Sequence, residues 1–275
     1  MTRIARLSLA LGLVAALAAP AAAQSTWLDR EHRPSVLVET LFPNFDGGGT
    51  DFPTWTWFAA TRLPLGSTKM FVGELPYSHG QIDNGGSTGG QGSIGNPYLG
   101  IEYAPKPSGL LVELGMRIPL ANDEKLLPFI VGYYTDAERQ EAFVPDQLTV
   151  RLGLHYHHAA NAASPIAYDV RVTPSAWIST SDGFVGESEM YVGYGAWLRY
   201  EGQTARVGGG LTGRWNATND GADFGEASVH QLDLGADFLA GSVRPGVMVK
   251  LPLDDDLTNV LGSVVGVTVT VVPGL

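Results

Sequence analysis

The sequence contains no cysteine, which excludes a fold held together by disulfides. Beyond the first residues it has no apolar run near the ~18 residues that a membrane-spanning helix needs. Basic residues are also scarce, with 17 Lys and Arg against 28 Asp and Glu. This negative balance argues against nucleic acid as a partner. The 35 glycines and 17 prolines disfavour long helices. Together with the lack of a membrane-spanning helix, this favours a protein built from strands.

The first residues have the pattern of a secretory signal. Arg3 and Arg6 precede an apolar stretch over residues 7–19, and three alanines end at Ala23. A basic region, an apolar core and an A-x-A site are typical of a cleaved signal peptide. We therefore expect residues 1–23 to be a signal peptide, 24–34 a periplasmic lead-in and 35–275 one folded domain.

Residues 189–200 alternate strictly between two kinds of side chain. Because strand side chains point to opposite faces in turn, one face of this stretch is apolar and the other is small, aromatic and charged. The apolar face carries Met190, Val192, Tyr194, Ala196, Leu198 and Tyr200, whereas the other carries Glu189, Tyr191, Trp197 and Arg199. The apolar face could meet a second sheet in a sandwich or lipid in a membrane barrel.

Similar stretches recur along the chain and favour the barrel. Twelve strands are predicted, over residues 35–42, 54–63, 68–77, 96–103, 109–118, 147–158, 167–178, 187–200, 204–216, 229–239, 243–253 and 262–272. The connections between them tend to alternate between longer and shorter, as extracellular loops and periplasmic turns do in outer-membrane barrels. The sequence therefore predicts an all-β, transmembrane, antiparallel up-and-down β-barrel in the cell outer membrane.

In this topology the faces opposite the apolar ones point into the lumen and carry both signs of charge. Such a mixture could line a narrow polar passage, or its members could pair with each other and fill the barrel. The residues that we expect to line the lumen are Glu113, Arg117, Arg151, Arg199, Arg206, Arg214, Asp233 and Asp237.

The predicted extracellular loops hold almost all of the net negative charge, including Asp136, Glu138 and Glu141 but also Arg139. An acidic rim could bind divalent cations that bridge to lipopolysaccharide phosphates. The alternative is a solvated surface that keeps the loops soluble.

The third extracellular loop is apolar and aromatic over residues 126–134. One interpretation is a loop that folds over or into the barrel mouth and offers Phe129, Tyr133 and Tyr134 to a ligand. The other is a strand that extends above the membrane. Thr135 and Glu138 have capping-box spacing, which predicts a short helix from there to about residue 143.

Three of the six histidines fall in residues 155–158. His155 and His157 share a strand face and could ligate a metal, but no nearby acid or cysteine completes a set. His157 or His158 could instead serve an outer-membrane lipid hydrolase, with Ser164 as the nearest serine. We interpret these histidines as structural, and assign no catalytic residue, metal site or cofactor.

Three segments resemble a known family. Residues 95–103 read Gly-Asn-Pro-Tyr-Leu-Gly-Ile-Glu-Tyr, 115–120 read Gly-Met-Arg-Ile-Pro-Leu, and 250–254 read Lys-Leu-Pro-Leu-Asp. They resemble the outer-membrane barrels of the meta-pathway phenol-degradation transporter family. The resemblance implies passage of small, often aromatic, molecules.

We therefore expect passive passage or binding of a small solute, aromatic or hydrophobic in nature, and no enzymatic activity. The expected surroundings are outer-membrane lipid and lipopolysaccharide. Two alternatives stay open: a sealed structural or adhesion barrel that acts through its acidic loops, and a lipid-modifying enzyme.

Overall fold

The computed structural model describes residues 33–45, 54–83, 88–106, 108–161, 163–181, 187–219, 221–239 and 241–273. The expected signal peptide and most of the lead-in lie outside these ranges. The strands are β1 (Ser35–Phe45), β2 (Trp55–Pro64), β3 (Lys69–Asp83), β4 (Thr88–Ile94), β5 (Tyr98–Tyr103), β6 (Gly109–Arg117), β7 (Gln147–His158), β8 (Ile166–Ser179), β9 (Glu189–Glu201), β10 (Ala205–Asn216), β11 (Ser228–Phe238), β12 (Val243–Pro252) and β13 (Leu261–Val271). The helices are α2 (Leu126–Thr135), the 3₁₀ turn η1 (Gln140–Ala142) and α3 (Asp255–Thr258).

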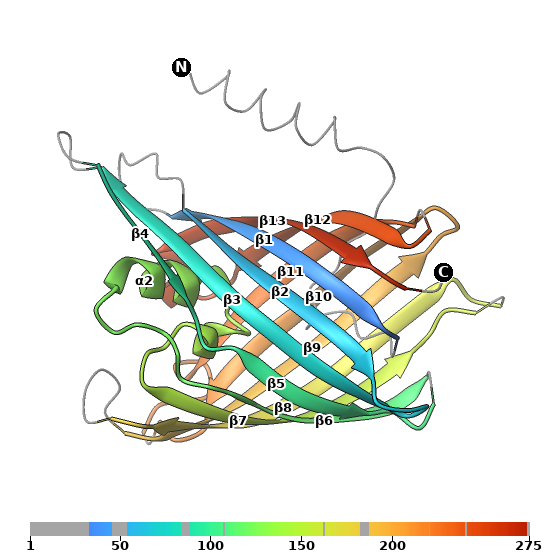
Figure 1. The fold of residues 1–275 in the computed structure, drawn as a ribbon, viewed down its shortest axis with the longest axis horizontal. Coiled ribbons are helices and arrows are strands. Elements are labelled where there is room, and N and C mark those ends of the chain that lie inside the picture. The colour runs from blue at the N-terminus through green and yellow to red at the C-terminus, as the bar shows by residue number, and fades with distance from the viewer. Residues whose placement is uncertain are drawn as a thin grey trace, which may run out of the picture.

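The strands form a closed barrel (Figure 1). Each strand pairs antiparallel with its neighbour in the ring, and β1 closes the ring against β13, with Leu41 opposite Gly266. Closure pairs the strands of the ring on both sides, so their backbone groups need no hydrogen bond from lipid, as a membrane barrel requires. The prediction of an all-β, antiparallel up-and-down barrel is confirmed.

Thirteen strand segments occupy twelve positions in the ring, because β4 and β5 both pair with β3. The sequence analysis placed residues 78–95 wholly in a loop, and this was wrong. In the structure β3 continues to Asp83, and β4 returns along it. β4 reads TGGQGSI, and glycine-rich strands hold their place by backbone hydrogen bonds without an apolar alternation that could reveal them.

The two faces of the barrel wall differ sharply. Outward side chains such as Leu114 and Leu198 are 60% and 57% exposed, whereas the inward Glu113 and Arg199 are 0% and 1% exposed. An apolar outer surface around a charged interior is the arrangement of a barrel in lipid, so this chain is an outer-membrane barrel. Among the described residues no helix is long and apolar enough to span a membrane.

The long connection between β6 and β7, residues 118–146, turns back into one end of the barrel, where α2 packs beside β3 (Figure 1). A β carbon on Gly80 of β3 would lie 3.1 Å from side-chain atoms of Leu127 and Val131, so glycine leaves room for the helix.

Of the two interpretations of residues 126–134, the connection follows the one in which it folds into the barrel mouth, and the strand alternative and the helix expected after Thr135 were wrong. Residues 126–134 form a helix, not an extension of a strand. A helix was expected to begin at Thr135, but α2 ends at this residue. Thr135 Oγ1 donates a hydrogen bond to the carbonyl of Val131. Only the short turn η1 lies in the range predicted to be helical. The capping-box spacing misled because the Thr135 hydroxyl bonds backwards, along its own helix.

Candidate functional site

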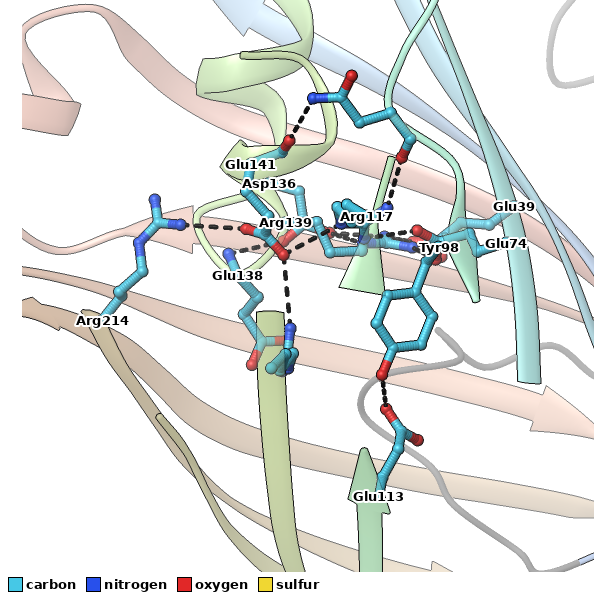
Figure 2. A network of polar contacts seen from close by, with 12 residues as sticks. Glu39, Glu74, Tyr98, Glu113, Arg117, Asp136, Glu138, Arg139, Glu141 and Arg214 are labelled. Atoms are coloured by element: carbon cyan, nitrogen blue, oxygen red, sulfur yellow. Dashed lines mark hydrogen bonds and ion pairs between the residues drawn. The ribbon is translucent and has the colours of Figure 1, made fainter. Parts of the chain in front are cut away.

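The segment that follows α2 lies inside the lumen. We call residues 136–145 the plug, because every one of them is buried among the strands. The plug carries four charged side chains, and their partners lie on the barrel wall (Figure 2).

Arg139 is the centre of the first group of contacts. Its guanidinium pairs with Glu39 of β1 at 3.0 Å, with Glu74 of β3 at 3.2 Å and with the plug's own Asp136 at 2.6 Å. Its carbon Cζ lies 3.5 Å from the centre of the Phe58 ring. A guanidinium can serve several carboxylates at once because its donors form a rigid planar fork.

The ionisation of this group follows from its contacts. Burial alone would raise the pKa of Asp136, but Arg139 and Lys250 outweigh it and hold the pKa below its usual range. Burial would likewise lower the pKa of Arg139, but Asp136, Glu39 and Glu74 raise it above the ordinary arginine value. Asp136 and Arg139 are therefore both charged at neutral pH.

Glu141 is the centre of the second group. Its carboxylate lies 3.2 Å from Arg117 of β6, 3.6 Å from Arg151 of β7 and 3.3 Å from Arg214 of β10. Figure 2 shows Arg214 reaching Glu141 from the side of the barrel opposite Glu39 and Glu74.

Two further ion pairs complete the set, Glu138 with Arg171 of β8 and Asp136 with Lys250 of β12 at 3.2 Å. Four plug side chains thus contact charged residues of seven strands, β1, β3, β6, β7, β8, β10 and β12.

Apolar and backbone contacts also hold the plug. Phe143 belongs to a buried cluster with Leu41, Phe58 and Val264, and its ring meets the Phe58 ring edge-on at 5.8 Å between centroids. On another side, the Asn96 amide donates hydrogen bonds to the plug carbonyls of residues 141 and 144, at 3.0 and 2.7 Å.

A second layer of charged residues lies on the inner wall, toward the end where the short turns lie. Its ion pairs join neighbouring strands, β7 with β8, β8 with β9 and β10 with β11. Asp169 contacts Arg199 at 3.1 Å and His157 at 2.7 Å, and Arg206 contacts Asp237 at 3.0 Å. The lumen therefore carries ion pairs at two levels, between plug and wall in the first and between neighbouring wall strands in the second.

The residues expected to line the lumen are all buried inside the barrel, at 6% exposure or less. They are Glu113, Arg117, Arg151, Arg199, Arg206, Arg214, Asp233 and Asp237. The structure brings Arg117, Arg151 and Arg214 together around Glu141, and places Arg199, Arg206 and Asp237 in the second layer. Glu113 accepts a 2.5 Å hydrogen bond from Tyr98, and Asp233 lies 3.7 Å from Lys250.

The aromatic residues expected to contact a ligand, Phe129, Tyr133 and Tyr134, lie half-buried on α2. Tyr133 stands between the other two, with its ring centre 5.5 Å from that of Phe129 and 5.3 Å from that of Tyr134. Burial raises the pKa of Tyr133, so its hydroxyl stays neutral.

The expected place of four charged residues in the extracellular rim was wrong. Asp136, Glu138, Arg139 and Glu141 lie deep in the lumen. The rim is accordingly less acidic than expected. A loop that alternates charges of both signs with small and apolar residues was the available signal, since a solvated rim needs neither Arg139 nor Phe143.

The histidines are not gathered into one site. His157 pairs with Asp169 inside the barrel, and His158 stacks on Tyr168 with 4.9 Å between ring centres. Within the described ranges, no group of three or more His, Asp or Glu could hold a metal ion.

Comparison with known proteins identifies the fold. No family model and no curated protein sequence matches the chain. Among solved structures it is similar to the COG4313 outer membrane channel from Pseudomonas putida, with a TM-score of 0.59 and 12% identity over 91% of this chain and 99% of that one.

The NanC porin has a TM-score of 0.51 and 7% identity, covering 86% of this chain and 98% of the porin. The translocator domain of the autotransporter NalP from Neisseria meningitidis has a TM-score of 0.50 and 13% identity, covering 97% of each chain. At these identities the likeness establishes a shared outer-membrane barrel architecture.

Proposed function

We propose that this barrel passes small solutes across the outer membrane through a lumen that the plug closes. The observation that carries the proposal is that charged residues of the wall pair with charged residues of the plug. In the outer half of the lumen, charges on seven strands contact a separate segment of chain. A plug held largely by ion pairs can exchange those contacts for water and solute, because paired charges buried in protein gain little net free energy over hydrated ones.

The solved channels of similar fold support this function, because they show that the architecture accommodates passage. For the nature of the solute, we propose a small molecule with an aromatic or hydrophobic part. The support is the resemblance to the phenol-degradation transporter family and the row of aromatic rings on α2. Aromatic side chains at a pore mouth bind such molecules by stacking and burial.

The test is conductance of the purified protein in planar lipid bilayers, for the wild type and for Arg139→Gln. The variant removes the residue that ties Asp136, Glu39 and Glu74 together, which should cost roughly 3–5 kcal/mol of plug binding. We expect small conductance from the wild type and severalfold larger conductance from the variant. Lys106→Gln, which removes an exposed cation at a turn, is the matched control and should behave as the wild type.

Each protein should first pass a folding test, a shift in gel mobility between unheated and heated samples in SDS. Folded wild type and folded Arg139→Gln that both fail to conduct would contradict passage. That result would favour a sealed structural barrel, for which the ion pairs between neighbouring wall strands in the second layer are the supporting observation.

A further inference from the structure

The surroundings of Glu141 have the composition of an anion-binding site. Three guanidinium groups, those of Arg117, Arg151 and Arg214, converge on one carboxylate. Arg117 also binds Glu74 at 2.7 Å, but the local balance still favours positive charge. Arginine clusters of this kind recognise carboxylates by charge-assisted hydrogen bonds.

Hydrogen-bond donors without partners lie beside this cluster. Within the described part of the chain, the side-chain amide of Gln147, Thr149 Oγ1, Trp177 Nε1 and Arg214 Nη2 have no hydrogen-bond partner. The exposure of these four side chains is 5% or less. Buried polar groups are normally satisfied, so unsatisfied donors beside a cluster of arginines indicate a place that can receive an acceptor.

The sheet register explains why these groups are neighbours. Thr149 of β7 lies directly opposite Arg117 of β6 on one side and Trp177 of β8 on the other. Side chains directly opposite each other on one face are ~5 Å apart at their β carbons. Arg214 Cζ lies 4.7 Å from the centre of the Trp177 ring and 5.0 Å from that of Tyr191. Donors and aromatic rings thus form one continuous surface at the level of Glu141.

We propose that this surface is a binding site for small carboxylates, and that Glu141 occupies it as an internal competitor. The proposal rests on the proposed passage function and adds a solute class to it. A carboxylate solute that displaces Glu141 would take over its arginine contacts, and Thr149, Trp177 and Gln147 would add hydrogen bonds. The plug would then lose its hold on β6, β7 and β10, so the solute itself would favour opening.

Competition sets the expected affinity. Glu141 is tethered to the site and has a high effective concentration there, so a free carboxylate must reach roughly millimolar concentration to displace it. Replacing Glu141 by glutamine removes the competing charge and keeps the side-chain size. Free carboxylate should then bind at least about tenfold more tightly, which corresponds to ~1.4 kcal/mol.

The experiment measures benzoate binding to the purified full-length protein in detergent by isothermal titration calorimetry. We expect Glu141→Gln to bind benzoate more tightly than the wild type. Benzyl alcohol, which has the ring without the charge, should bind no more tightly to Glu141→Gln than to the wild type. Adding Arg214→Gln to Glu141→Gln should abolish the gain.

The matched control is Glu138→Gln, which removes a plug carboxylate from Arg171 and leaves the arginines around Glu141 unchanged. An equal gain in this control would overturn the proposal, because loosening of the plug would then explain the binding. If Glu141→Gln did not fold, the wild type and Arg214→Gln would still decide, since the site predicts weaker benzoate binding in Arg214→Gln.

The outcome separates this proposal from the passage function. Conductance in bilayers without benzoate binding, in both the wild type and Glu141→Gln, would overturn the carboxylate site and leave passage standing. Benzoate binding that requires Arg214, in a protein that never conducts, would support the site and overturn passage.

Discussion

Asp136 shows how a buried charge can hold the plug. It contacts Lys250 and so joins the plug to β12. It also contacts Arg139, which in turn binds the carboxylates of β1 and β3. Buried ion pairs are weak contributors to net stability but costly to break on one side, since the remaining partner is left charged and unpaired. Such a contact favours one position of the plug over all nearby alternatives.

The pH dependence of Asp136 gives a prediction at this scale. Because its pKa in the folded protein lies below the ordinary 3.8, its stabilising contribution is complete above that value. The contribution is lost as the pH falls through the lower, folded-state pKa. We expect Asp136→Asn to unfold several degrees below the wild type at neutral pH, and the difference to shrink below about pH 4.

Thermal unfolding in detergent, followed by tryptophan fluorescence at a series of pH values, measures this difference. Asp123→Asn, which changes an exposed acid at the start of the same connection, should follow the wild type throughout. If the difference in unfolding temperature between wild type and Asp136→Asn stayed constant as the pH fell, the Asp136 carboxylate would not contribute to stability through its charge.

Among the elements, the bend between β4 and β5 determines where the plug can lie. Asn96 in this bend is fully buried, and each of its polar side-chain atoms is used twice. Its amide donates to two plug carbonyls, and its Oδ1 accepts from the amides of Leu120 and Ala121, both at 2.8 Å. One side chain thus fastens both the entry and the exit of the long connection.

We predict that Asn96→Asp releases the plug without unfolding the barrel. Aspartate cannot donate to the two carbonyls and would place a negative charge against them. Each lost buried hydrogen bond costs roughly 1–3 kcal/mol of plug binding, so the two together cost several kcal/mol. Trypsin is the measurement, because Arg139 is fully buried and becomes a cleavage site only when the plug leaves the lumen.

Cleavage after Arg139 in folded Asn96→Asp, and not in folded wild type, is the expected result. Asn122→Asp is the control, since Asn122 is exposed and, of its side-chain atoms, Oδ1 alone makes a described hydrogen bond, which aspartate keeps. If the peptide bond after Arg139 resisted trypsin in Asn96→Asp as well as it does in the wild type, Asn96 would not hold the plug in place.

The elements also show what a sequence can reveal. The strand predicted over 147–158 coincides with β7, because alternate residues face lipid and lumen and the period is strong. β4 was missed because glycine has no side chain to alternate. The sequence allowed residues 126–134 to fold into the barrel mouth. It did not place residues 136–145 in the lumen, because their position depends on partners far along the chain, such as Glu39, which lies 100 residues from Arg139. Local periodicity carries no information about such contacts.

For the whole molecule, we expect the two layers of charge to act as two barriers in series. The plug layer can open by movement of one segment, whereas the second layer is part of the wall and moves only by side-chain rearrangement. Once the plug is released, Arg199 and Arg206 with their partners Asp169 and Asp237 should form the narrowest charged zone. Fixed charges at a constriction select the ions that pass it.

The last prediction concerns selectivity in the Arg139→Gln background. Replacing Arg199 and Arg206 by glutamine removes two positive charges from beside Asp169 and Asp237 and makes this zone more negative, so the pore should shift toward cations. The reversal potential in a salt gradient measures this shift, and it should be largest at low salt because screening extends over ~10 Å at 0.1 M. Lys106→Gln in the same background should leave the potential unchanged, since its charge is exposed at a turn. If the double arginine variant also leaves it unchanged, ions do not pass through the second layer, and the conducting path must lie elsewhere in the barrel.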